Sequence, residues 1–190
     1  SGAGSNVAVW HGPDGTVLID DGVASLAPQL LAAVQKIAPG PVRVVISTHW
    51  HPDHTGGNEH FAGSGSVLVA HDNVRARLSE PQTVAAYDLE VPAAPAGALP
   101  IVTFDDALSL HLNGDRLDAV HVEAAHTDGD LVLWWEDANV VHVGDVYYSG
   151  DRKLLEKLLK KKEGRDRLKL YLGHSGWSPG QLQGEIVRGS

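Results

Sequence analysis

Two spacings of apolar side chains divide this chain into expected strands and helices. Alternation with a period of two, or a short run of β-branched residues, is typical of strands. It marks residues 6–10, 16–19, 42–48, 65–71, 108–123, 130–145 and 168–172. Spacing of three to four residues is typical of helices, and it marks residues 25–37, 73–79 and 154–159. A last helix is expected to begin at Ser178-Pro179.

The mixture of hairpins and crossovers predicts an α/β (α+β) fold built from two sheets. Asn113-Gly114 stands between two alternating runs and is a typical hairpin turn, whereas the helix at 25–37 connects two separate strands. The length of 190 residues suits one domain, and apolar residues make up 43%, enough for a packed core. We therefore expect a single two-sheet sandwich over residues 1–190.

Composition excludes several classes of protein and of site. The chain contains no cysteine, so disulfides and thiolate ligands are excluded, and any metal site must use His, Asp or Glu. No apolar run approaches the ~18 residues that a membrane span needs. No signal peptide is visible, and both ends, Ser1-Gly2 and Gly189-Ser190, resemble remnants of processing or expression. A soluble protein of unknown location is therefore expected, with no membrane partner.

Charge is distributed unevenly along the chain, whose net charge is −9. Residues 1–148 contain five basic and 19 acidic residues, whereas residues 149–190 contain ten basic and five acidic ones. Six of the seven lysines follow residue 150, and most of them flank the leucines of the helix expected at 154–159. A lysine-rich segment can bind nucleic acid, but a solvated helix face is the simpler interpretation. The acidic remainder also argues against nucleic acid as a partner.

The densest chemistry lies in the segment STHWHPDHTGGN, which begins at Ser47 directly after an apolar run. It places four ligand-type side chains within six residues: His49, His51, Asp53 and His54. The two histidines in the extended part point the same way, and Pro52 then turns the chain so that the other two side chains face a second point nearby. Imidazole nitrogens and carboxylate oxygens bind zinc. This density and order favour a loop that serves two metal ions over an accidental polar loop.

The run from His49 to His54 resembles the HxHxDH signature of the metallo-β-lactamase-fold hydrolases, one of the more specific short motifs of a metal site. The likeness extends over residues 6–148 and includes LIDDG before the first helix. It implies an αββα sandwich and hydrolysis of β-lactams, thioesters, lactones or phosphoesters. It also implies three further ligands at later strand ends, which this chain offers as His126, Asp145 and His174.

The same resemblance distributes these seven side chains over two metal ions, with zinc expected and iron or manganese as alternatives. One ion would be held by His49, His51 and His126. The second would be held by Asp53, His54 and His174, with Asp145 as the bridge.

Three other side chains compete for roles around this site. His142, three residues before Asp145, is more simply a core group or a support for a ligand than a ligand itself. His71 ends an expected strand and could border the site, although no motif supports it. Asp130 could orient a ligand, because metal-bound histidines normally hydrogen-bond to such groups.

Residues 149–188 depart from this family and resemble the C-terminal element of the small bacterial AlgH-type proteins. The shared features are a leucine-rich helix, a strand at Leu168–Leu172 and the run GHSGWSPGQLQGE, in which His174 stands where that element has tyrosine. The hydrolases usually have a longer stretch before their last histidine. Together with the break in charge and the absence of methionine, this favours an engineered chimera with residues 149–190 as a graft over a divergent natural tail.

Two metal ions about 3.5–4 Å apart can share a hydroxide. The expected reaction is therefore hydrolysis of a β-lactam, ester, thioester or lactone carbonyl in a small-molecule substrate. Asp53 is the expected catalytic residue, because it could orient the hydroxide and pass its proton on. The alternative is an engineered chimeric metal-binding scaffold with little or no activity, because a grafted tail can leave a site too loose for catalysis. Substrate, native metal and oligomeric state stay open.

Overall fold

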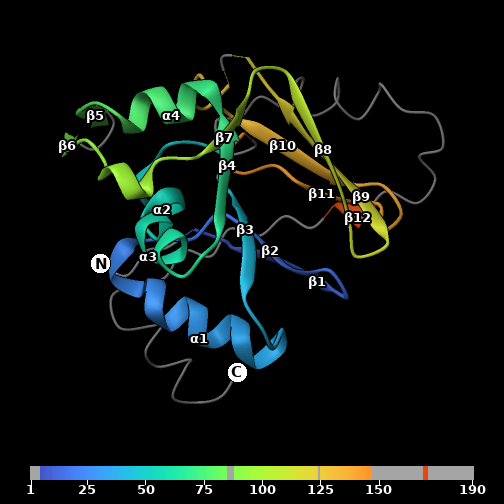
Figure 1. The fold of residues 1–190 in the computed structure, drawn as a ribbon. Coiled ribbons are helices and arrows are strands. Elements are labelled where there is room, and N and C mark those ends of the chain that lie inside the picture. Colours follow the sequence, from blue (N-terminus) through green and yellow to red (C-terminus); the bar gives the residue numbers. More distant parts are fainter. Residues whose placement is uncertain (1–4, 85–87, 124, 147–168, 171–190) are drawn as a thin grey trace.

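The computed structural model describes residues 5–84, 88–123, 125–146 and 169–170, which form two five-stranded sheets, a small hairpin and short helices (Figure 1). The strands of the first sheet are, in order, β1 (Ala8–Gly12), β2 (Gly15–Ile19), β3 (Val42–Ile46), β4 (Val67–His71) and β7 (Val102–Phe104). Those of the second are β12 (Lys169–Leu170), β11 (Val140–His142), β10 (Leu131–Trp135), β9 (Asp115–His121) and β8 (Ala107–Leu112). The expected two-sheet α/β sandwich is confirmed.

The described α-helices are α1 (Ala27–Ile37), α2 (Pro52–Thr55), α3 (Asn58–Gly63) and α4 (Asp72–Leu78). Helices α1 and α3 cover the outer face of the first sheet, and their apolar side chains pack on it (Figure 1). Two 3-10 turns, Ala24–Leu26 and Ala96–Ala98, and a hairpin of β5 (Gln82–Val84) with β6 (Leu89–Val91) complete this part. Among the described helices, none has the length and apolar character to cross a membrane.

The parallel strands of the first sheet bring their carboxyl ends to one edge. Strands β2, β3, β4 and β7 run parallel, and β1 pairs with β2 antiparallel. In the second sheet, β9 and β10 are antiparallel, so β9 ends where β10 begins. A hydrogen bond from the Leu131 N–H to the Thr48 carbonyl (2.8 Å) joins the two sheets there. Segments far apart in the sequence therefore meet beyond β3 and β9, and carboxyl ends of strands are where α/β sheets commonly bind ligands.

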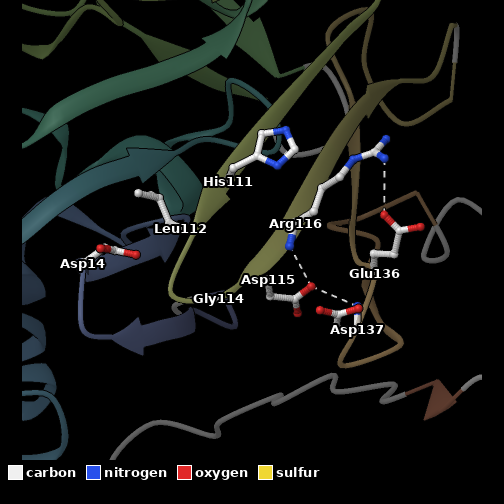
Figure 2. A pocket seen from close by; sticks show the side chains of 8 residues that line it. All are labelled: Asp14, His111, Leu112, Gly114, Asp115, Arg116, Glu136 and Asp137. Atoms are coloured by element: carbon white, nitrogen blue, oxygen red, sulfur yellow. Dashed lines mark hydrogen bonds and ion pairs between the residues drawn. The ribbon is translucent and has the colours of Figure 1, made fainter.

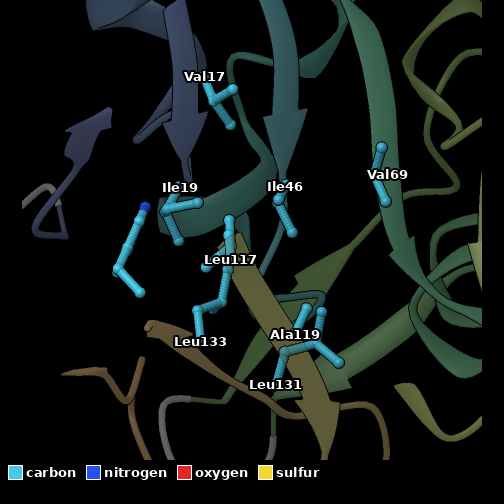
Figure 3. Packing of buried hydrophobic residues seen from close by; sticks show 9 residues of the cluster. Val17, Ile19, Ile46, Val69, Leu117, Ala119, Leu131 and Leu133 are labelled. Carbon is cyan, nitrogen blue, oxygen red and sulfur yellow. The ribbon is translucent and has the colours of Figure 1, made fainter. Parts of the chain in front are cut away.

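The period-two pattern sorts apolar side chains onto the two faces of the first sheet. Along β2, Val17 and Ile19 point between the sheets, whereas Leu18 points toward α1. Figure 3 shows the inter-sheet cluster, whose other labelled members are Ile46, Val69, Leu117, Ala119, Leu131 and Leu133. Because both faces of the sheet are buried, its parallel strands read as nearly continuous apolar runs. Each such side chain contributes roughly 1.5–3 kcal/mol of burial free energy.

Most expected elements are present with shifted bounds, and several short ones were not expected. The helix expected at 25–37 divides into a 3-10 turn and α1. Helix α2 contains Asp53 and His54, so the second half of the motif, which we expected to be a loop, is helical. Helix α3 was not expected, and the three-residue strands β5, β6 and β7 are too short to show alternation. The strand expected at 168–172 is found at Lys169–Leu170, parallel to β11. The helices expected at 154–159 and from Ser178 lie outside the described residues.

Candidate metal centre

Three imidazole rings converge at the edge where the two sheets meet. His49 and His51 follow β3, and His126 lies in the loop between β9 and β10. The Nε2 atom of His49 lies 3.1 Å from the Nδ1 atom of His51, and the Nε2 atom of His126 lies 3.0 Å from that same nitrogen. His49 is buried, whereas His51 and His126 are partly exposed. Three nitrogens from two distant segments therefore face one point that solvent can reach.

The spacing and protonation of these nitrogens suit a tetrahedral metal ion. Zinc–nitrogen bonds of ~2.0–2.1 Å place tetrahedral ligands roughly 3.3 Å apart. Burial lowers the pKa of His49 well below its usual value. Burial, together with the charge of His126, lowers the pKa of His51 to about 4. Both rings are therefore neutral at pH 7, and each keeps a lone pair that can bind a metal ion.

A buried chain of hydrogen bonds fixes the orientation of His49. Asp20, directly after β2, accepts hydrogen bonds from the backbone N–H (2.7 Å) and the hydroxyl (2.8 Å) of Thr48. Since that hydroxyl gives its hydrogen to Asp20, it can only accept from Nδ1 of His49, 3.0 Å away. The His49 proton therefore lies on Nδ1, and Nε2 presents its lone pair to the cluster. Hydrogen bonds of this kind normally set the tautomer of a metal-binding histidine.

His54, Asp53 and Asp145 form a second group beside the first. The ring centroid of His54 lies 4.0 Å from that of His49. Its Nε2 atom lies 3.6 Å from Oδ2 of Asp53 and 3.6 Å from Oδ1 of Asp145. The other oxygen of Asp145 lies 3.7 Å from Nε2 of His126. Asp145 thus faces both groups, which is where a bridging ligand would lie.

The Nε2 atom of His54 is buried and has no hydrogen-bond partner among the described residues. The other ring nitrogen, Nδ1, contacts Oδ2 of Asp20 at 2.7 Å, which turns Nε2 toward Asp53 and Asp145. Burial disfavours a charge on this ring, but Asp20 and Asp145 outweigh burial and raise the pKa of His54 to about 10. A buried, unpartnered ring nitrogen that faces two carboxylates is suited to bind a cation, so these residues fit a metal ion.

Gly144 allows Asp145 to reach the cluster. Its φ is +49°, in the region that favours glycine, and a Cβ at this position would lie 2.9 Å from Oγ1 of Thr48. Any side chain at position 144 would therefore displace the segment from Thr48 and move Asp145 away from the histidines.

The described residues bring together six of the seven predicted ligands, and His174 lies outside them. The two closest groupings of ligand atoms are His49 with His51 and His126, and His49 with His54 and Asp145. Asp53 adjoins the second grouping through the 3.6 Å contact given above.

The other three candidates lie outside both groupings. Asp130 acts on the backbone, because its Oδ2 accepts hydrogen bonds from the N–H groups of His126 and Thr127, both at 2.6 Å. His142 accepts from the Gly144 N–H through Nδ1 (3.2 Å), which makes it a support for the segment of the bridging aspartate. His71 stacks on another histidine and belongs to neither grouping.

Sequence reasoning missed Asp20 and Thr48 as supports of the cluster. The available signal was the acidic pair Asp20-Asp21 directly behind an apolar run, and both carboxylates are 0% exposed. Fully buried carboxylates are rare without partners, but the sequence alone does not show that these two are buried.

The described residues also form a shallow pocket of about 410 Å³ at the opposite end of the strands (Figure 2). The turns of three hairpins line it with Asp14, His111, Leu112, Gly114, Asp115, Arg116, Glu136 and Asp137. Asp115 accepts from the backbone N–H groups of Arg116 and Asp137, and Arg116 pairs with Glu136 at 3.2 Å. These side chains stabilise the turns, so the pocket is separate from the histidine cluster in both place and chemistry.

Curated relatives match parts of this chain. An acyl-coenzyme A thioesterase of Gallus gallus is 28% identical over 79% of this chain and 60% of the relative. Metallo-beta-lactamase domain-containing protein 1 of Homo sapiens is 38% identical over 36% of this chain and 26% of its own length. A UPF0301 protein of Chlorobaculum tepidum, of the AlgH type, is 34% identical over 83 residues, which are 43% of this chain and 41% of the relative. The chain thus spans less than two thirds of the length of each of these relatives.

Solved structures show the same fold. A metallo-beta-lactamase from Pontibacter korlensis superposes with a TM-score of 0.59 and 24% identity, over 72% of this chain and 58% of that one. The metallo-beta-lactamase MIM-1 from Novosphingobium pentaromativorans gives a TM-score of 0.61 and 22% identity, over 83% of this chain and 64% of that one. The expected αββα type of sandwich is confirmed.

A family model described as "Metallo-beta-lactamase superfamily" matches residues 2–178. That match extends past residue 148, and the 83 residues of the AlgH-type match are more than residues 149–190 contain, so the two likenesses overlap. Since the family model covers most of the sequence and the fold agrees with it, the chain belongs to the metallo-β-lactamase superfamily.

Proposed function

We propose that this protein is a hydrolase that binds two metal ions, most simply zinc, and acts on a carbonyl group of a β-lactam, ester, thioester or lactone. The observation that carries the proposal is the convergence of three imidazole nitrogens beside Asp145, a carboxylate that faces both ligand groups. Members of the superfamily are hydrolases. Its relatives here include a protein named as an acyl-coenzyme A thioesterase and one named as a linear primary-alkylsulfatase, so the fold does not choose the substrate.

The ligand assignment follows the order of the motif. His49, His51 and His126 would hold the first ion, whereas Asp53, His54 and His174 would hold the second, with Asp145 between them. Metal ions at these positions supply a Lewis acid and a bound water whose pKa falls toward ~7. The neutral His49 and His51 rings and the buried Nε2 atom of His54 support this assignment.

Asp53 is the side chain of the cluster best placed to move a proton. It is 44% exposed, and its Oδ2 lies 3.6 Å from the buried Nε2 atom of His54, so it adjoins both solvent and the cluster. An ionised carboxylate there can accept a proton from the attacking water at Oδ2 and release it to the leaving group. Trp50 is 9% exposed, and its ring centroid lies 4.5 Å from that of His51. Its indole therefore shields one side of the cluster from solvent.

We also propose that residues 149–190 are a graft. In this proposal the grafted segment completes a single domain over residues 1–190 and does not form a second one. The break in charge and His174 in place of tyrosine support it. Because the two likenesses overlap, a join at residue 148 would have to lie inside a segment that resembles both families.

The test is metal analysis followed by turnover. Protein purified without chelator and reconstituted with zinc should hold near two equivalents. It should hydrolyse at least one of nitrocefin, a thioester, an aryl ester and a lactone, with activity lost on chelation and restored by zinc. Two bound zinc ions without turnover of any substrate would favour the metal-binding scaffold, and no bound zinc would overturn the proposal.

A further inference from the structure

Two histidines outside the ligand groups stack on each other where the sheets meet. His71 ends β4 and His121 ends β9, and their ring centroids lie 3.7 Å apart with an interplanar angle of 21°. His71 is 1% exposed. Neither ring belongs to a metal-ligand grouping of the described residues, and the proposed reaction uses neither. Their hydrogen bonds show what they hold.

The direction of each hydrogen bond gives each ring a distinct role. Nδ1 of His71 accepts from the backbone N–H of Asn73 at 3.1 Å and so caps the start of α4. Nε2 of His121 lies 3.1 Å from the carbonyl oxygen of Asp128. A carbonyl oxygen only accepts, so this nitrogen of His121 carries a hydrogen and donates it. His121 is therefore an anchor for the loop that contains Asp128.

That loop is the one that carries His126. The Asp128 carbonyl receives a second hydrogen bond, from Nδ2 of Asn73 at 2.7 Å. Next to it, Gly129 lies so close to α4 that a Cβ would be 2.9 Å from Cγ2 of Val74. The loop is therefore fixed at Asp128 between the start of α4 and the end of β9.

His126 depends on such anchors more than its partners do. His49 lies three residues after β3 and His51 directly precedes α2, whereas His126 lies in the middle of the irregular loop between β9 and β10. Asp130 holds the middle of that loop through the N–H groups of His126 and Thr127. A displacement of ~1 Å is enough to loosen a metal site. A second anchor at Asp128, two residues after His126, therefore restricts how far the His126 ring can move.

We propose that His121 is a positioning residue for the metal ligand His126. Its Nε2–H holds the Asp128 carbonyl and thereby keeps the His126 imidazole among the first three ligands. The stack on His71 fixes the plane of the His121 ring and with it the direction of the N–H. This inference rests on the proposed metal centre.

The test separates the N–H from the ring. His121→Phe keeps a flat ring for the stack but loses the donor, whereas His121→Gln keeps an N–H donor of similar reach but loses the ring. Zinc affinity is measured by competition with a chromophoric chelator. His121→Phe should bind zinc ~10–100-fold more weakly, in the range of supports of a metal ligand, and His121→Gln should stay within about threefold of wild type. His111→Phe, at an exposed position on neighbouring β8, is the matched control and should not change the affinity.

A second measurement guards against a folding defect. Hydrogen exchange of the backbone amides 127–130 in the metal-free protein should be faster in His121→Phe and unchanged in His121→Gln. If His121→Phe does not fold, Asn73→Ala takes its place. It removes the other donor to the same carbonyl and should also weaken zinc binding.

The outcomes distinguish this inference from the proposed function. A wild-type protein that binds no zinc would overturn both. Wild-type binding that is equally tight in His121→Phe and Asn73→Ala would overturn the inference alone and leave the proposed function standing. A His121→Gln variant as weak as His121→Phe would show that an N–H donor at this position does not maintain zinc binding, which also overturns the role proposed for His121.

Discussion

The two ends of the sandwich both gather polar side chains, but only one end buries them. At the turn end, the acidic side chains accept hydrogen bonds from nearby backbone or pair with Arg116, and water reaches them (Figure 2). At the other end, Asp20 and His49 are 0% exposed, and the buried Nε2 atom of His54 has no partner among the described residues. The pocket of about 410 Å³ therefore lies away from the histidine cluster.

The difference favours desolvation, rather than concavity, as the feature that marks the candidate site. A carboxylate in water needs no cation, whereas a buried polar atom without a partner costs roughly 1–3 kcal/mol or more. Imidazoles and carboxylates that are buried together lose their hydrogen bonds to water. A metal ion bound between them would replace those interactions. Variants at the two ends can break or sharpen this comparison.

The largest contrast is expected for one conservative change made at each end. Asp53→Asn keeps the size of the side chain but removes a charge that the proposed second ion and the attacking water would both need. Hydrolysis should fall by at least ~10²-fold, as for loss of a positioned acid or base. Asp137→Asn, the matched change in the turn-end pocket, should leave turnover within about twofold. Steady-state kinetics on the best substrate of the panel measure both, and unchanged turnover in Asp53→Asn would remove Asp53 from the reaction.

His174→Tyr, which restores the tyrosine of the AlgH-type element, should weaken the second metal ion only. The first ion keeps all three of its ligands, whereas the second loses one, so its affinity should fall by more than the ~10–100-fold typical of a supporting residue. The fold should persist without metal, because the resembled element has tyrosine at this position. Zinc titrations and thermal melts with and without chelator measure this. Equal affinity for the second zinc in both proteins would remove His174 from the ligand set, and an unfolded metal-free variant would count against the borrowed tail.

Asp20→Asn should weaken metal binding although it replaces none of the proposed ligands. The amide can offer Thr48 and His54 only one acceptor atom where the carboxylate offers two, so the His54 ring loses its orientation. Zinc affinity should drop by ~10–100-fold. Asp115→Asn, which changes a carboxylate at the turn end, is the control and should bind zinc as wild type does. Similar affinities in Asp20→Asn and wild type would mean that His54 does not need this contact.

The sequence predicted the fold class and the place where ligand-type side chains gather better than it predicted the short elements. The fold class was predictable because strands buried on both faces read as apolar runs. Four ligand candidates came from the dense motif, whereas His126 and Asp145 came from the order of ligands in the resembled family, and the structure brings these six side chains together. The motif was expected directly after an apolar strand, and it follows β3. Strands of three residues such as β7 carry too little pattern to be recognised, and their pairing depends on the neighbouring strand.

Two further supports of the site, Asp20 and His121, were not predictable, because they depend on contacts between distant segments. Nothing local in the sequence links His121 to the Asp128 carbonyl or Asp20 to Thr48. His71 shows the same limit: at a strand end it was a candidate for the border of the site, yet its partner is the stacked ring of His121. Register and sheet packing decide such contacts.

The smallest expected effect is a pH dependence of stability from His71, measured in chelator. Burial, followed by the neighbouring His121, lowers the pKa of His71, although Asp105 and Asp72 act in the opposite direction. The folded protein therefore binds fewer protons at His71 than the unfolded chain, in which a histidine has a pKa of ~6.5. The contribution is constant above that value, and stability is lost as the pH falls below it toward the folded-state pKa.

His71→Asn isolates this effect, because an asparagine side chain can still accept from the Asn73 N–H at the start of α4. Relative to this variant, the wild type should lose less than ~1 kcal/mol of additional unfolding free energy between pH 7 and pH 5.5, as expected for one group. Urea unfolding at several pH values measures the difference. Parallel pH profiles for the two proteins would show that His71 does not titrate in this range. A wild type that gains stability relative to the variant on acidification would reverse the sign argued for the buried ring.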